Sequence, residues 1–364
     1  MQIQEVIDIL EDFAPTAYAE DFDNVGLLVG DPSSQVKGAI ITLDTLEEVV
    51  DEAIGKNCNL IISFHPIIFS GLKKLNGKNY VERTVLKAIK NDIAIYAIHT
   101  ALDNQQKGVN DMICKKLGLI NRKILIPRSQ SIKKLTIFVP NKNAEEVRKA
   151  LFEAGAGSIG NYDNCSFNLK GSGSFKPNED ANPVIGKKGE VHFEEETQIG
   201  LTFPTHLEGK ILKALFYSHP YEEVAYEVTS LDNSNQHLGM GMIGELEEEQ
   251  EETAFLQKVK QIFNSGCIRH SELLQKPVKK VAVLGGSGSF AIENAKRAEA
   301  DIYITADLKY HDFYKAEKRL VLADIGHYES EQYTKNLLHS YLTKKISNFA
   351  LILAETNTNP IKYI

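Results

Sequence analysis

The chain has 364 residues, which at roughly 100 to 200 residues per domain predicts two or three domains. Hydrophobic residues make up 43% of the chain and charged residues 25%, as in ordinary globular proteins, so the composition excludes a disordered or fibrous chain. The formal net charge of −8 argues against nucleic-acid binding, which needs a basic surface.

The first thirteen residues are acidic, with apolar residues at helical spacing, whereas a signal peptide needs a basic start and an apolar run. No stretch approaches the ~18 apolar residues of a membrane span. The four cysteines form no CxxC pair, which excludes a disulfide framework and a thiolate zinc site. We therefore expect a cytoplasmic protein with no membrane partner.

Short β-rich runs alternate with helical patterns at both ends of the chain, which is typical of a parallel sheet covered by helices. The expected elements of the first part are residues 39–43, 46–54, 60–63, 81–90, 93–98 and 109–117. Those of the last part are residues 280–284, 292–298, 301–305, 312–318, 320–324, 331–341 and 349–353. The pattern predicts an α/β protein with a three-layer core made from residues 1–127 and 246–364.

The middle of the chain has a different order: strand, helix, a glycine-rich hairpin, helix and strand. This order is typical of a ferredoxin-like α+β unit. We expect such an inserted domain at residues 128–245.

Three predicted strands end in histidine or carboxylate residues. His65 follows the strand 60–63, His99 and Asp103 follow the strand 94–98, and His327 follows the strand 321–325. The carboxyl ends of parallel strands form the crevice where ligands bind. The sequence therefore predicts that three strands deliver these side chains to one sheet edge.

His327 and Glu331 lie four residues apart at the start of a predicted helix, which places both side chains on one face. An isolated pair of this kind is more often a surface ion pair than a metal site. The neighbouring strand ends favour a metal, because imidazole and carboxylate together suit Zn, Fe or Mn, and a bridging glutamate suits a two-metal site.

A glycine turn, Gly285-Gly286-Ser287-Gly288, follows the strand that begins at Lys280, and with Ala291 it satisfies GxGxx[GA]. As a dinucleotide fingerprint it is weak, because it does not open its domain and Asp307 fits the acidic position only loosely. It is alternatively a tight structural turn, or a turn whose N–H groups at residues 286–288 bind a substrate anion.

Three further side chains are candidates for proton transfer: His99, His311 and Glu329. A lone histidine is more often structural, so a structural role is the alternative for His99 and His311. His219, in Ser218-His219-Pro220-Tyr221-Glu222-Glu223, is compatible with metal binding but equally with a turn between a helix and a strand.

Six motifs occur in this order in the outer parts of the chain: Asp23-Asn24-Val25-Gly26-Leu27, Ser63-Phe64-His65-Pro66, His99-Thr100-Ala101-Leu102-Asp103, Gly285-Gly286-Ser287-Gly288, Asp307-Leu308-Lys309-Tyr310-His311 and Gly326-His327-Tyr328-Glu329-Ser330-Glu331. Together they resemble the Ngg-interacting-factor-like family, often called GTP cyclohydrolase 1 type 2 homologues. The resemblance implies a centre of two divalent metal ions (Zn, Fe, Mn or Mg) held by His65, Asp103, His327 and a bridging Glu331. It also implies hexameric rings, and the middle segment resembles the PII/CutA-type insert of longer members.

The sequence departs from the family pattern at Phe64, where the family usually has a second histidine before the proline. Phenylalanine offers no lone pair, so the second ion loses a ligand there. Water or His99 takes its place, or the site holds one tight and one weak ion.

The leading hypothesis is metal-assisted hydrolysis, and the resemblance suggests a purine nucleotide such as GTP as substrate, with ring opening and formate release. The alternative is a ring-shaped scaffold or sensor, in which the metal is structural and the insert binds an effector. A weaker third option, from the glycine turn, is a dinucleotide-dependent oxidoreductase.

Overall fold

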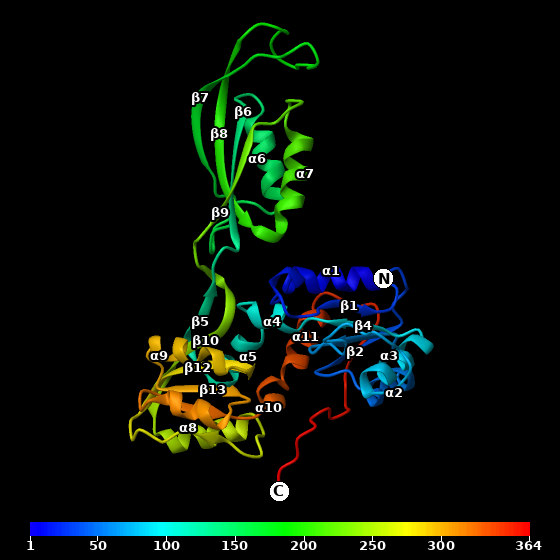
Figure 1. The fold of residues 1–364 in the computed structure, drawn as a ribbon, viewed down its shortest axis with the longest axis vertical. Helices are drawn as coiled ribbons and strands as arrows, with labels where there is room; N and C mark the ends of the chain where they lie inside the picture. The colour runs from blue at the N-terminus through cyan, green and yellow to red at the C-terminus, as the bar shows by residue number, and fades with distance from the viewer. The chain divides into compact units, whose positions relative to one another are not determined.

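The computed structural model describes residues 1–364, which form two compact units. One unit contains residues 1–126 and 237–364, and the other contains residues 127–236 (Figure 1). None of the helices combines the length and the apolar composition that crossing a membrane requires.

The first unit contains a five-stranded sheet with the order β1-β4-β3-β2-β15. Its strands are β1 (Gly26–Val29), β2 (Gly38–Thr42), β3 (Leu60–Ser63), β4 (Ala94–Ala97) and β15 (Ala350–Leu353). Strands β2, β3, β4 and β15 run parallel, and β1 pairs antiparallel with β4. The last strand of the chain therefore returns to the sheet that the first strands build.

Helices cover both faces of this sheet, because side chains alternate between its faces along each strand. Ile40, Ile61 and Ile95 pack in one apolar cluster with α2 and α3, whereas Ile41 and Ile62 pack in another with α1 and α5. The helices of this region are α1 (Ile3–Phe13), α2 (Glu47–Gly55), α3 (Tyr80–Lys90), α4 (His99–Asn104), α5 (Val109–Leu117), α11 (Thr334–Thr343) and the 3₁₀ turn η1 (Thr16–Tyr18). The result is a three-layer α/β arrangement.

The same unit contains a six-stranded sheet with the order β11-β14-β13-β12-β10-β5. Its strands are β5 (Ile120–Arg128), β10 (Asn235–Gln250), β11 (Arg269–His270), β12 (Val278–Ser287), β13 (Ile302–Ala306) and β14 (Val321–Asp324). Strands β12, β13 and β14 run parallel, while β10 and β11 are antiparallel to their neighbours β12 and β14. The helices here are α8 (Glu252–Ile262), α9 (Ile292–Arg297), α10 (His327–Glu331) and the 3₁₀ segments η3 (Ser289–Ala291) and η4 (Tyr310–Ala316).

One apolar core joins the two sheets. Val281, Ile302 and Val321 of the six-stranded sheet belong to the same buried cluster as Ile41 and Ile62 of the five-stranded sheet. The expectation of a single edge that carries all three strand ends is wrong in this respect, because β3 and β4 belong to one sheet and β14 to the other.

Residues 127–236 form an antiparallel sheet with the order β7-β8-β6-β9. Two helices pack against each other and against one sheet face around a buried cluster that includes Leu135, Val147 and Leu215. The elements are β6 (Ile132–Pro140), α6 (Ala144–Glu153), β7 (Phe167–Phe175), β8 (His192–Pro204), η2 (Thr205–Leu207), α7 (Glu208–Ser218) and β9 (Tyr226–Leu231). We call this unit the insert.

The insert ends earlier in the chain than the sequence suggests. We expected its end at residue 245, but Met242 to Glu245 pair with Val283 to Lys280 of β12. The stretch after residue 236 therefore belongs to the six-stranded sheet. The glycine-rich composition around it made the long strand β10 difficult to recognise.

Candidate metal centre

Two imidazole rings and one carboxylate converge in the first unit. Glu331 Oε2 lies 3.1 Å from His65 Nε2 and 3.2 Å from His327 Nε2. The two Nε2 atoms are 3.4 Å apart. The donor atoms of these three residues all lie within 4.8 Å of one another, and we call the three residues the His–Glu group.

Local structure explains how each side chain reaches this point. His65 follows the end of β3, between the fully buried Phe64 and Pro66. His327 begins α10 directly after Gly326, whose φ of +96° is a left-handed conformation that glycine adopts without strain. Glu331 lies one helical turn further on, so the expected i,i+4 pairing of His327 and Glu331 is present.

Each imidazole is held by a second carboxylate. His65 Nδ1 lies 2.8 Å from Asp44 Oδ1, and His327 Nδ1 lies 2.6 Å from Asp307 Oδ2. Such partners fix the ring orientation and direct Nε2 towards a metal. Asp44 Oδ2 in turn accepts a hydrogen bond from Thr358 Oγ1 at 2.6 Å.

The sequence analysis did not identify Asp44, and it named Asp307 only as a loose fit to the dinucleotide fingerprint and as part of a family motif. Both follow parallel strands: Asp44 lies two residues beyond β2, and Asp307 directly follows β13. The rule that singled out His65 therefore also applies to these carboxylates.

Charges within the His–Glu group stabilise one another. Burial would lower the pKa of His65, but Glu331 and Asp44 outweigh burial and raise it to about 10. Burial would also lower the pKa of His327, which Glu331 and Asp307 raise to about 11. Burial would raise the pKa of Glu331, but the two imidazolium rings hold it well below its usual range. The group can therefore exchange protons for a divalent ion.

The donor atoms fit one ion. Zinc binds histidine nitrogen and carboxylate oxygen at about 2.0 to 2.2 Å, so two donors at a tetrahedral angle lie about 3.4 Å apart. The three observed separations, 3.1, 3.2 and 3.4 Å, are close to this value. Two imidazoles and one carboxylate form a recognised ligand set for borderline divalent metals.

Asp103 lies near the His–Glu group but outside its compact set of donors. Burial raises the pKa of Asp103 well above its usual value, and the negative charge of Glu331 raises it further. Its Oδ1 atom is buried without a hydrogen-bond partner. An unpaired buried carboxylate oxygen is costly, so a cation or a proton is needed here.

His99 begins α4 next to the same site. Its ring centroid is 5.1 Å from that of His65, and its Nδ1 lies 2.8 Å from Asp23 Oδ1. Burial favours neutral Asp23, but hydrogen bonds from His99 and Thr100 lower the pKa of Asp23 to about 2. Phe64 packs against both rings, with centroids 4.9 Å from His65 and 5.5 Å from His99. The side chain at position 64 is therefore adjacent to the site but offers it no donor.

The other two candidates for proton transfer have different neighbours. His311 is exposed, and its ring contacts Tyr310 and Tyr314. Glu329 is buried on α10, where its Oε1 accepts a hydrogen bond from Asn359 at 3.1 Å. Of the two histidines, His99 is the one whose ring contacts a member of the His–Glu group.

The glycine turn packs tightly against the group. Gly286 N–H donates to Ser330 Oγ at 2.9 Å, and a Cβ at Gly286 would lie 2.3 Å from Glu331 Oε1. Ser287 Oγ donates to Asp307. A Cβ at Gly288 would collide with Thr305 Oγ1. The turn thus needs small residues so that Glu331 and the neighbouring strand can approach.

Comparison with known proteins identifies the family. The pattern of the family Duf34/NIF3 (NGG1p interacting factor 3) matches residues 1–360. A Bacillus subtilis protein named GTP cyclohydrolase 1 type 2 homolog is 38% identical over 371 residues, covering 99% of this chain and 98% of the relative. A Staphylococcus epidermidis protein of the same name is 34% identical over 367 residues, covering 100% of both chains.

Solved structures agree with this assignment. A crystal structure of a Bacillus cereus protein related to NIF3 has a TM-score of 0.87 and 40% identity, covering 100% of this chain and 99% of that one. A Staphylococcus aureus protein has a TM-score of 0.79 and 29% identity, with the same coverage. On these grounds the chain belongs to the Duf34/NIF3 family.

Proposed function

We propose that the chain is a divalent-metal-binding protein in which His65, His327 and Glu331 hold one ion. The observation that carries this proposal is the convergence of two Nε2 atoms and Glu331 Oε2 within 3.4 Å, with a carboxylate behind each imidazole. An ordinary surface ion pair explains neither the burial of Glu331 nor the second imidazole.

In this proposal Asp103 and Glu331 would hold a second ion. The orphaned Asp103 Oδ1 supports it. A water molecule would provide the donor that Phe64 lacks, which leaves His99 Nε2 available for proton transfer, because Nδ1 of that ring is engaged by Asp23. Zn, Fe, Mn and Mg are the candidate metals.

The proposed reaction is the hydrolytic opening of the imidazole ring of a purine nucleotide such as GTP, with release of formate. The name of the relatives supports this substrate. A bound ion supplies Lewis acidity, which lowers the pKa of water towards about 7 and polarises the substrate. Asp44 and Asp307 orient the two imidazoles, and His99 transfers the proton. The N–H groups of residues 287 and 288 in the glycine turn contact the substrate anion.

Formate release from GTP tests this reaction, after metal content has been measured in protein purified without chelators or a metal-affinity tag. The variant Glu331→Ala is expected to lose metal and formate release together. The matched control is Glu248→Ala, at an exposed glutamate in the same unit. Equal formate release by native protein and Glu331→Ala would overturn the hydrolase proposal, even if metal is lost.

A second function, a hexameric scaffold or sensor with a structural metal, is favoured by one observation: Phe64 occupies a buried position beside the site without a donor. The insert is the second support, since the PII/CutA-type effector domain that we propose for it is compatible with its strand order β7-β8-β6-β9. The result that favours it is metal bound at the site without formate release. In either function we place the protein in the cytoplasm, which its four free thiols support.

A further inference from the structure

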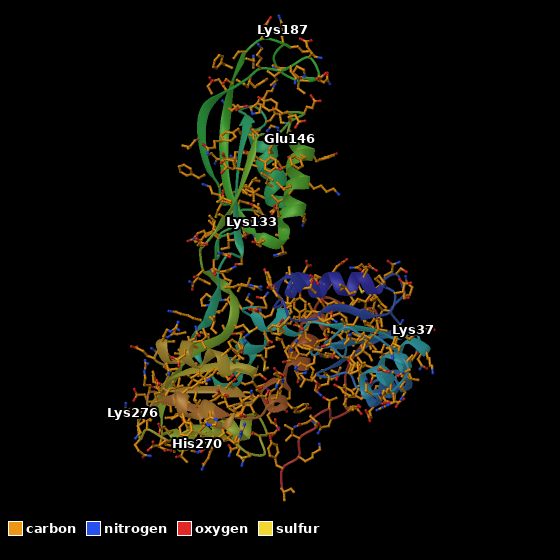
Figure 2. The ribbon with its side chains drawn as sticks, in the orientation of Figure 1. Lys37, Lys133, Glu146, Lys187, His270 and Lys276 are labelled. Atoms are coloured by element: carbon orange, nitrogen blue, oxygen red, sulfur yellow. The ribbon has the colours of Figure 1, made fainter.

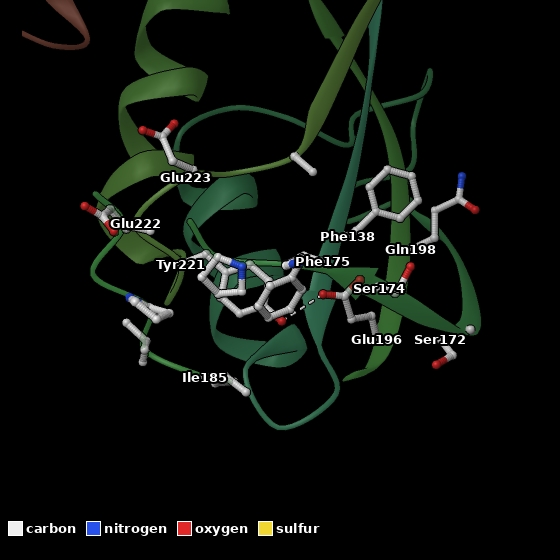
Figure 3. A pocket seen from close by; sticks show the side chains of 18 of the residues that line it. Phe138, Ser172, Ser174, Phe175, Ile185, Glu196, Gln198, Tyr221, Glu222 and Glu223 are labelled. Carbon is white, nitrogen blue, oxygen red and sulfur yellow. Dashed lines mark hydrogen bonds between the residues drawn. The ribbon is translucent and has the colours of Figure 1, made fainter. Parts of the chain in front are cut away.

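The insert contains a cavity that the metal centre does not explain. It lies inside the insert, lined by β6, β7, β8, the loop that follows β7 and the turn at residues 221–225 (Figure 3). Its volume of about 840 Å³ is within the range of about 300 to 1,000 Å³ typical of small-molecule sites. Most of its lining is apolar, with a few polar groups, as in sites that orient a ligand.

A buried carboxylate lies in the wall of this cavity. Glu196 of β8 is 8% exposed, and its Oε1 accepts a hydrogen bond from Tyr221 Oη at 2.9 Å (Figure 3). The protein donates no hydrogen bond to its other oxygen, Oε2. This atom lies against Gly173, so close that a Cβ added to Gly173 would be 2.2 Å from it. A carboxylate oxygen in this environment is stabilised by a cationic hydrogen-bond donor.

Aromatic side chains surround the carboxylate. Phe138 and Phe175 line the cavity together with Tyr221, and the ring centroids of Phe175 and Tyr221 are 5.6 Å apart at 62°. The faces of such rings attract cations. Aromatic faces beside a carboxylate thus form a site suited to an organic cation with an apolar body.

His219 holds this wall in place. Its Nδ1 accepts a hydrogen bond from Tyr221 N–H at 3.1 Å, and its Nε2 donates to the Phe138 carbonyl at 3.0 Å. Burial lowers the pKa of His219, which agrees with a neutral ring that both accepts and donates. The turn that carries Tyr221 is therefore fixed to β6 before any ligand arrives.

The charge around the cavity also favours a cation. Besides Glu196, its lining contains the carboxylates of Asp180, Glu222 and Glu223, against the ammonium groups of Lys170 and Lys176. Acidic residues are therefore in excess. An anionic ligand would also have to approach the buried Glu196, which is unfavourable.

We propose that the insert binds a small organic cation in this cavity, with its ammonium group between Glu196 Oε2 and the aromatic rings. The apolar part of the ligand lies along Phe138 and Phe175. This site is separate from the His–Glu group and does not depend on the function proposed above.

Isothermal titration of the full-length protein with a matched series tests the site: 4-phenylbutylamine, 4-phenylbutanol and 4-phenylbutanoate. The amine is expected to bind at least about tenfold more tightly than the alcohol, and the carboxylate most weakly. Equal affinities for amine and alcohol, or no binding of the amine up to about 10 mM, would overturn the proposal.

Two variants locate the binding. Glu196→Gln should reduce amine affinity to that of the alcohol, whereas Glu146→Gln, the same charge change at an exposed position on α6 (Figure 2), should leave it unchanged. Phe175→Leu keeps an apolar side chain but removes the ring face, so it should lower the ratio of amine to alcohol affinity even if Glu196→Gln does not fold. An amine affinity that neither variant changes would place the ligand elsewhere.

Discussion

Glu331 and Glu196 are both buried carboxylates that lie against a glycine, but their other neighbours differ. Glu331 Oε2 faces His65 and His327, each backed by a further carboxylate. Glu196 faces a phenol and the aromatic wall of the cavity. Burial of a carboxylate is common to a metal centre and an organic-cation site, so the atoms that converge on it decide which ligand it suits.

The histidines of the two regions show the same contrast. His65 and His327 offer Nε2 to the glutamate, and their pKa values are raised by neighbouring carboxylates. His219 uses both ring nitrogens in hydrogen bonds to backbone groups, and burial lowers its pKa. His219 is therefore a positioning residue with no free donor for a metal.

The largest expected effect is a difference in zinc binding between variants of the two glutamates. Loss of a residue that only orients a metal ligand, such as Asp44, weakens metal binding ~10- to 100-fold. Glu331→Gln should weaken zinc binding by more than this, because Glu331 would bind the ion directly. Glu196→Gln should bind zinc like the native protein. Zinc equivalents and affinity measured by competition with a chelating dye would check this. A similar loss in both variants would show that the comparison is wrong.

The pH dependence of zinc affinity sharpens the comparison between the histidines. Raised pKa values of about 10 for His65 and 11 for His327 mean that zinc displaces protons, so affinity should rise between pH 6 and 8. The rise is up to about tenfold per pH unit for each proton released. A chelating-dye titration at several pH values, corrected for proton binding to the dye, measures it. A flat profile would contradict the raised pKa values.

The same pKa values predict how metal-free protein responds to pH. Both folded pKa values exceed the unfolded value of about 6.5, so the stabilisation is complete below that pH and is lost as pH rises through about 10 and 11. Urea unfolding in the presence of a chelator should therefore show stability decreasing above about pH 6.5. The double variant His65→Gln/His327→Gln should lack this component.

Replacing a carboxylate that orients an imidazole should have an intermediate effect on zinc affinity. Asp44→Asn keeps the size of the side chain but weakens its hold on His65 Nδ1, so zinc affinity should fall about 10- to 100-fold. The control is Asp51→Asn, which alters a carboxylate paired with Lys87 on the surface. If the two variants bind zinc equally, Asp44 does not orient His65.

The smallest expected effect concerns the glycines. Gly286→Ala places a side chain at a φ of +69° and against Glu331, whereas Gly118→Ala has a similar φ of +74° with open space around its Cβ. Both should lose about 1 to 2 kcal/mol of unfolding free energy from backbone strain. Only Gly286→Ala should also weaken zinc binding. Urea unfolding measures the loss of stability in both variants, and dye competition measures their zinc affinity. A loss of zinc affinity in Gly118→Ala would contradict the prediction.

Much of the site could be predicted because short buried strands end in chemically distinct residues. The run Leu60–Ser63 followed by His65, and Val321–Asp324 followed by His327, gave both imidazoles their correct local positions. The i,i+4 spacing to Glu331 completed the three donors. Each of these features depends on residues close together in the sequence, so the sequence pattern alone predicts it.

Long-range features could not be predicted in the same way. Nothing local shows that β3 and β14 lie in different sheets, or that β15 pairs with β2 across about 310 positions of sequence. The hydrogen bond from Thr358 to Asp44 is equally remote. The insert cavity was also missed, because the exposed face of β7 resembles a solvated, glycine-rich hairpin.

The return of β15 to the five-stranded sheet has a consequence for biosynthesis. A growing polypeptide contains Asp44 and His65 long before the ribosome adds Glu331, β15 and Thr358. During that interval β2 is an open sheet edge, and His65 has neither its glutamate nor a fully anchored aspartate. The proposed ion therefore cannot meet all three donors until residue 331 has been made, and the open edge of β2 stays exposed to other chains until β15 pairs with it.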